Sequence, residues 1–246
     1  MTSSPETETP SMAKHPFPDQ THARSAATKI YEHLVAAIVD HRLPPGTKLP
    51  EDRLAEVYGA SRARIREILL GLGHERLVTL QPNRGAFVAE PTVRETQEIC
   101  EARRIIEAAT VTAAVRNADK VALERLRDLV EQEDTAWRRN DQHAAVRLSR
   151  EFHACLAEIA GNSILSDTLR NILARNSLSV AIYERRGSPG CLCSEHYSIL
   201  DAIERRDAES AQQLMIQHLN HIEERMNLTE PEGKEVDIVA ILREAL

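Results

Sequence analysis

From Thr92 onward the chain carries helical periodicity and no alternating β-pattern. Apolar residues recur at helical spacing in six consecutive segments, at about residues 92–116, 120–140, 142–160, 164–186, 192–206 and 208–228. Short polar breaks separate these segments, among them NADK, RRND, AGNS and RRGSPG. Six helices of this length enclose a core of their own, so we expect an all-helical antiparallel bundle over residues 92–228, with a domain boundary near Pro91. This predicted unit is called the helical domain below.

Composition supports a mainly α fold. An apolar content of 42% is enough for a buried core, whereas 3% aromatic residues and only nine glycines disfavour a β-sandwich. The net charge of −7 is unevenly distributed, because residues 24–90 contain ten basic and eight acidic side chains and therefore carry +2. The acidity lies C-terminal to residue 90, so the net charge of the whole chain does not exclude a nucleic acid partner for the N-terminal part.

The two ends of the chain differ from its middle in composition and periodicity. Residues 1–23 are rich in Ser, Thr, Pro and Glu without periodicity, which predicts a disordered tail. Residues 229–246 end in a short amphipathic pattern, which predicts a tail helix. Since no run of about 18 apolar residues and no apolar signal segment is present, we expect a cytoplasmic protein without a membrane span.

Four cysteines, Cys100, Cys155, Cys191 and Cys193, occur without secretory context, so reduced thiols are expected. Cys191 and Cys193 are spaced as CxC, which differs from the CxxC of redox motifs and zinc knuckles. A loop or helix start explains this pair, and a redox or metal role is the alternative.

The N-terminal part predicts a small DNA-binding unit. Residues 28–40 have one apolar helical face, and the Pro-Pro-Gly of HRLPPGTKLP forces a turn after it. EDRLAEVYG is a short helix ended by Gly59, and a third helix begins after Ser61, a good N-cap residue. Two short β-prone runs, residues 77–80 and 86–89, then flank a Pro82–Gly85 turn. Helix, turn, helix and β-hairpin together predict a winged helix-turn-helix over residues 24–90, called the winged-helix domain below.

The third helix carries the side chains that reading DNA requires. Arg62, Arg64 and Arg66 lie in its first turns, where a recognition helix presents residues to base edges. The Ser61 hydroxyl at the helix N-terminus can hold a phosphate. Arg84 at the tip of the wing can reach the minor groove or a phosphate. A solvated basic face is the alternative for an isolated helix, and the flanking turn and wing weigh against it.

The segment from Ile30 to Glu90 resembles the winged helix-turn-helix of GntR-type bacterial transcription regulators, most specifically in SRxxxRE and RGxFV. The resemblance implies DNA contacts by Arg62, Arg66, Ser61 and Gly85. Members usually have an arginine where Asp52 stands, so the phosphate contact there is either lost or shifted to Arg53. Ala63 and Arg64 replace a common Thr-Pro, which implies a different sequence preference.

Three histidines of the helical domain fall on apolar helical faces: His153 beside Phe152 and Leu156, His196 before Ile199, and His218 near Met215. A single inward histidine is usually a hydrogen-bonded core residue. Three on separate helices are harder to explain in this way, because each buried imidazole needs partners for both nitrogens. A shared divalent cation would satisfy all three.

The helical region, residues 93–227, is similar to the FCD ligand-binding domain of the same regulators, through EARRIIEAA, REFHACLAEIAGNSIL and SEHYSILDAIERRDAESAQQLMIQHL. The resemblance implies a metal, most often zinc, held by His153, His196 and His218 together with an aspartate. Ser149 stands at that aspartate position, so either water or effector completes the shell or the site holds no metal. His221 is a possible substitute ligand, although surface exposure is the simpler interpretation.

The resemblance also implies an effector site. Arg103 matches a cavity-lining arginine, and a guanidinium suits a carboxylate effector; an ion pair with an acidic side chain is the alternative. Asn162 is expected to be a helix-terminal turn residue.

These observations favour a homodimeric, ligand-responsive transcriptional repressor that binds an inverted-repeat operator and is not an enzyme. One alternative is a three-histidine metal-dependent hydrolase, but its candidate bases Glu151 and Glu195 are expected to point away from the site. A thiol-based sensor using Cys191 and Cys193 is the other alternative.

Overall fold

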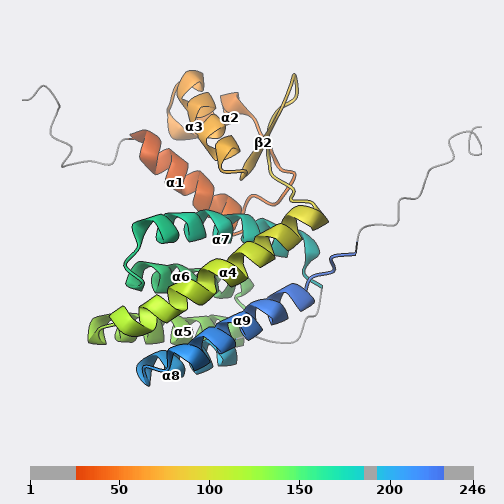
Figure 1. Cartoon of the computed structure of the whole chain (residues 1–246). Coiled ribbons are helices and arrows are strands. Elements are labelled where there is room, and N and C mark those ends of the chain that lie inside the picture. Colours follow the sequence, from red (N-terminus) through yellow and green to blue (C-terminus); the bar gives the residue numbers. More distant parts are fainter. Residues whose placement is uncertain (1–25, 186–192, 230–246) are drawn as a thin grey trace, which may run out of the picture.

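The computed structural model of the protein describes residues 26–185 and 193–229, which form two stacked parts (Figure 1). The predicted tail over residues 1–23, the predicted C-terminal tail helix and Cys191 lie outside the described residues. Within the described part of the chain, no helix is long and apolar enough to cross a membrane.

The winged-helix domain contains three helices and a small sheet. Its elements are α1 (Ala26–Val39), β1 (Lys48–Leu49), α2 (Glu51–Tyr58), α3 (Arg62–His74), β2 (Val78–Gln81) and β3 (Gly85–Val88). The strands are antiparallel in the order β1-β3-β2, with Leu49 opposite Ala86 and Leu80 also opposite Ala86. The three helices and the wing predicted from the sequence are confirmed, whereas the two-residue strand β1 was not predicted.

Local signals in the sequence set the ends of these elements. Gly59 ends α2 with a left-handed φ of 60°, and the Ser61 side chain caps α3 by accepting a hydrogen bond from the Arg64 amide at 3.2 Å. In the wing, Asn83 has a φ of 62°, and the Arg84 amide donates to the Gln81 carbonyl at 3.1 Å. The turn therefore holds the wing tip in a defined conformation.

Within the described residues, the helical domain contains six helices, as expected. They are α4 (Val93–Asn117), α5 (Lys120–Arg138), α6 (Gln142–Ile159), α7 (Ser163–Tyr183), α8 (Cys193–Glu204) and α9 (Ala208–Glu224). Thr92 and Glu95 form a capping box at the start of α4. Asn162 caps α7 through hydrogen bonds from the amides of Ile164 and Leu165, which confirms its expected helix-terminal role.

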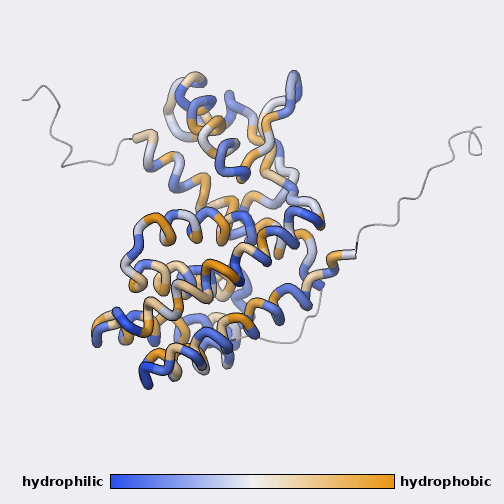
Figure 2. Tube along the Cα trace, viewed as in Figure 1, coloured by the Kyte–Doolittle hydropathy of each residue, from blue (hydrophilic) through white to orange (hydrophobic). Residues whose placement is uncertain are grey.

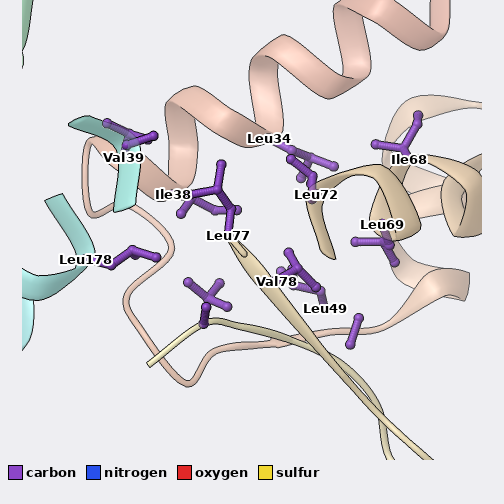
Figure 3. Close-up of a cluster of buried hydrophobic side chains, with 14 of the residues drawn as sticks. Leu34, Ile38, Val39, Leu49, Ile68, Leu69, Leu72, Leu77, Val78 and Leu178 are labelled. Atoms are coloured by element: carbon purple, nitrogen blue, oxygen red, sulfur yellow. The ribbon is translucent and has the colours of Figure 1, made fainter. Parts of the chain in front are cut away.

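Each part has its own hydrophobic core, and apolar residues alternate with polar ones along the helices (Figure 2). One helix crosses this division, because Ala174 and Leu178 of α7 belong to the core of the winged-helix domain. Figure 3 shows Leu178 on the α7 side of this cluster, near Ile38 and Val39 of α1. The two parts are therefore joined by a continuous apolar contact as well as by the chain.

Candidate functional site

The first turns of α3 present an exposed basic surface. Ser61, Arg62, Arg64 and Arg66 are all solvent-exposed. Arg64 pairs with Glu67 at 2.7 Å, and Arg66 makes a two-pronged contact with Glu51 at 2.9 and 2.7 Å. Exposed ion pairs of this kind contribute only about 0–1 kcal/mol, so they can be exchanged for contacts to phosphates or bases at little cost.

The wing places a second basic group beside this surface. The Arg84 guanidinium lies 5.7 Å from the centre of the Phe87 ring, and Lys48 Nζ lies 5.9 Å from the same ring. Gly85 has a φ of 95°, a backbone conformation that favours glycine. No atom lies near the position of an added Cβ, so steric crowding is not the reason for glycine here. Arg53 of α2 is exposed and lies 3.4 Å from Glu56. Asp52 is also exposed.

The three predicted histidines meet inside the helical domain. Nε2 of His196 lies 3.0 Å from Nε2 of His218, and Nε2 of His218 lies 3.3 Å from Nε2 of His153. All three side chains are buried, and among the described residues they form the group whose ligand atoms lie within 4.8 Å of one another. They come from α6, α8 and α9, so tertiary packing alone brings them together.

A carboxylate lies behind each imidazole. Nδ1 of His196 is 2.7 Å from Glu133 Oε2, and Nδ1 of His218 is 2.7 Å from Glu195 Oε2. Nδ1 of His153 is 2.5 Å from Glu107 Oε2, a close contact whose angles are poor for a hydrogen bond. Carboxylates in this position favour the tautomer with the proton on Nδ1 and leave Nε2 as a bare acceptor.

Three such Nε2 atoms facing one another carry converging lone pairs, which repel without a cation or proton between them. The arrangement of imidazoles backed by carboxylates is the donor set of histidine-bound divalent metals. The residues present therefore fit a divalent cation.

Burial also favours the neutral form of two of these imidazoles, those of His153 and His218. It lowers the pKa of His153, although Glu107 acts in the opposite direction, and it lowers the pKa of His218 well below the usual value, helped by the neighbouring His196 and His153. Burial alone would raise the pKa of Glu107, but Arg103 and His153 outweigh it and lower that pKa to about 2. Neutral histidines beside ionised carboxylates are the protonation states that metal binding requires.

A cavity of about 120 Å³ adjoins the histidines. Its wall includes His153, His218, Ser149 and Arg103, together with an apolar side formed by Val146, Leu173, Val180 and Ile222. Ser149, at the position where the family resemblance implies an aspartate, thus borders the same space as two of the histidines. Arg103 donates from Nε to Glu107 at 2.7 Å, which confirms the ion pair. It also lines the cavity, and its contact with an effector stays a prediction.

Other sequence-based candidates lie elsewhere. His221 is outside the histidine group and contacts Glu195 Oε1 through Nδ1 at 2.5 Å. Glu151 pairs with Arg147 on its own helix at 3.0 Å. The expectation that Glu195 points away was wrong, because α9 packs against α8 on that side and brings His218 and His221 to its carboxylate.

The cysteines also depart in part from expectation. Cys100 and Cys155 are free and buried, and burial raises the pKa of each thiol to about 11, which makes them poor nucleophiles. Cys193 is disulfide-bonded, so the expectation of a reduced thiol there was wrong.

Sequence reasoning missed Glu107 and Glu133. Both are almost fully buried, at 1% and 4% exposure. A signal was present for Glu133, which continues the apolar stripe of Leu126 and Val130 along α5. An acidic residue on a buried helical face needs a partner, and this could have pointed to the histidines.

Comparison with known protein families agrees with this architecture. The family model for bacterial regulatory proteins of the gntR family matches residues 26–88, and the FCD domain model matches residues 98–221. The first covers the helix-turn-helix and wing, and the second covers the three histidines.

Individual relatives are similar over most of their length. The HTH-type transcriptional repressor RspR of Escherichia coli is 26% identical over 80% of this chain and 86% of its own, and the Uxu operon regulator of Haemophilus influenzae is 26% identical over 72% and 73%. A GntR transcriptional regulator from Rhodococcus sp. RHA1 has a similar structure, with a TM-score of 0.73 and 26% identity over 82% of this chain and 97% of its own. McbR/YncC of E. coli, at 20% identity and a TM-score of 0.74, covers 91% and 99% and shares the fold. These families comprise transcriptional regulators and not enzymes, and the chain belongs to the GntR family of bacterial DNA-binding transcriptional regulators, with a C-terminal FCD domain.

Proposed function

We propose that this protein is a ligand-responsive repressor that binds an inverted-repeat operator as a homodimer. The exposed basic surface of α3 and the wing supports DNA binding through Ser61, Arg62, Arg64, Arg66, Arg84, Gly85 and Arg53. Two copies related by a two-fold axis would present two such surfaces to matching half-sites. An effector would regulate this binding by favouring one arrangement of the two winged-helix domains over another.

We further propose that His153, His196 and His218 hold zinc. The observation that carries this proposal is the convergence of three Nε2 atoms while each Nδ1 faces a carboxylate. When bound, the cation supplies a positive centre that attracts an anionic ligand. Ser149 provides no carboxylate, so water or the effector would complete the coordination shell of a bound cation.

The proposed effector is a small carboxylate that occupies the cavity beside the histidines. The cavity combines an apolar wall with cationic side chains, including Arg103. Such a lining suits a small organic anion, because the apolar wall contacts its carbon atoms while a guanidinium binds its carboxylate.

The DNA-binding proposal is tested with sequences selected by the full-length protein from a random duplex library. The double variant Arg62→Ala/Arg66→Ala is expected to lose about 100-fold or more in affinity for the selected duplex, because each arginine contact to a base is worth about 1–3 kcal/mol. Arg94→Ala/Arg138→Ala is the matched control, since it removes the same charge from exposed positions of the helical domain. Equal affinity of the two double variants would show that α3 does not read DNA.

The metal proposal is tested by elemental analysis of protein purified without a histidine tag. Wild-type protein is expected to contain zinc, and His153→Ala/His196→Ala is expected to lack it. Equal metal in both proteins, or none in either after incubation with zinc and gel filtration, would refute a three-histidine site. Sedimentation analysis of the same samples tests the dimer.

A further inference from the structure

In addition to the apolar contact with α7, three polar contacts link the segment just after α1 to the helical domain. His143 Nδ1 donates to the Asp40 carbonyl at 3.0 Å, and His41 Nε2 donates to the Ser177 carbonyl at 2.8 Å. Arg150 of α6 lies near the Asp40 carboxylate, with 3.8 Å between Nη2 and Oδ1. Arg150 and Ser177 also line the cavity beside the histidines. Two residues that line the cavity, Arg150 and Ser177, therefore also contact the winged-helix domain.

The contact between Arg150 and Asp40 is incompletely satisfied. A separation of 3.8 Å is too long for a hydrogen bond. Among the described residues, neither Arg150 Nε nor Asp40 Oδ1 has a hydrogen-bond partner, although both atoms are buried. Burial also lowers the pKa of Arg150, which reflects the cost of keeping this guanidinium out of water. A half-buried guanidinium whose Nε–H is buried and unpaired attracts an anion.

The lining of the same cavity includes a second polar atom without a partner. Asn176 is 7% exposed, lines the cavity, and its Oδ1 has no hydrogen-bond partner within the described part of the chain. Arg103, by contrast, already donates from Nε to Glu107. The cavity thus has an unfilled donor and an unfilled acceptor, and both lie on residues other than the arginine that the sequence indicated.

We propose that Arg150 binds the anionic group of the effector, and that this bond replaces the attraction of Arg150 to Asp40, so that the end of α1 is loosened from the helical domain. This inference rests on the proposed function, because it takes the cavity as the effector site. It identifies the residue that joins the effector to the winged-helix domain. Because both anions are attracted by the charge of one guanidinium, binding of the effector weakens the attraction between Arg150 and Asp40, and this coupling is reciprocal.

The first test uses acetate, the simplest carboxylate, as the probe. Thermal unfolding of the full-length protein is followed during acetate titration, with sodium chloride of equal ionic strength as reference, because a ligand of the folded state raises its melting temperature. Acetate is expected to stabilise wild type and Arg147→Met beyond chloride and to have no such effect on Arg150→Met. Arg147 is the matched control, since it lies on the same helix outside the cavity and pairs with Glu151. Stabilisation of Arg150→Met equal to that of wild type, or no acetate effect on wild type, would overturn the proposal.

The second test uses the partner residue, so that the result does not depend on the folding of Arg150→Met. Asp40→Asn removes the competing charge and is expected to raise the affinity for acetate about two- to fivefold, the range for a weak ion pair. Unchanged affinity would refute the competition between Asp40 and the anion. Zinc content and binding to the selected duplex are measured on the same variants. If wild-type protein neither contains zinc nor binds the selected duplex, the proposed function is contradicted. If it does both, but the acetate response does not depend on Arg150 and Asp40, only this inference is contradicted.

Discussion

Replacing Glu133 by alanine is expected to weaken zinc binding by about 10- to 100-fold. Glu133 Oε2 accepts a hydrogen bond from His196 Nδ1 at 2.7 Å, and both side chains are buried. A hydrogen bond to an ionised group contributes about 1.5–3 kcal/mol, and about 1.4 kcal/mol corresponds to a tenfold change in affinity. Removing the carboxylate also frees the ring to rotate and to place its proton on Nε2, where the metal would bind.

The assay is a competition titration of the full-length protein against a chromophoric zinc chelator. Glu131→Ala is the matched control, because Glu131 is an exposed acidic residue on the same helix. Glu133→Gln separates two contributions, since the amide oxygen still accepts the Nδ1 proton but carries no charge, and an intermediate affinity is expected. The melting temperature of each metal-free variant shows whether the bundle remains folded.

The reasoning would be refuted if folded Glu133→Ala bound zinc as tightly as Glu131→Ala. That result would mean that Glu133 does not orient His196 for a cation. The buried carboxylate would then have only a structural role as a partner of the imidazole.

Three further predictions concern other parts of the molecule. Leu178→Ala is expected to lower the free energy of unfolding by about 2–5 kcal/mol, measured by urea denaturation, whereas Ile182→Ala on the same helix, where the side chain is 38% exposed, should cost much less; equal costs would contradict the shared core. Burial lowers the pKa of His41, so the stability that neutral His41 contributes is lost as the pH falls below about 6.5. His41→Gln should therefore reduce the fall in melting temperature between neutral and mildly acidic pH. A pH profile of the melting temperature equal to that of wild type would contradict this prediction. Ser149→Asp is expected to tighten zinc binding in the chelator titration, because it adds an anionic oxygen ligand beside His153, and an unchanged affinity would show that Ser149 does not face the cation.

Much of the secondary structure could be predicted because its signals are local. The N-cap Ser61, the terminator Gly59 and the cap Asn162 act within a few residues of their own positions, and the structure places helix ends there. Strand β1 was missed because two residues give no periodicity. Lys48 and Leu49 become a strand only by pairing with β3, which is nearly 40 residues away.

The sequence predicted the three histidines of the site but not the carboxylates that contact their Nδ1 atoms. Helical spacing put His153, His196 and His218 on inward faces, but their meeting depends on how three helices pack. The carboxylates of Glu107 and Glu133 come from two further helices, so no spacing along the chain relates them to their histidines. The relation of Arg150 to Asp40 is equally non-local, since it requires the residue that follows α1 to lie near α6.

The position of Leu178 and Ala174 in the core of the winged-helix domain limits how these two units can be recombined. A chimera that exchanges the segment before Pro91 for another DNA-binding unit keeps the cavity and the histidines but sets α7 against an unrelated surface. Compatible exchange requires the incoming α1 to match the apolar face of α7 as well as the residue that faces Arg150. The predicted domain boundary near Pro91 is therefore not the place at which this regulator can be divided, because the unit that must be exchanged together includes one face of α7.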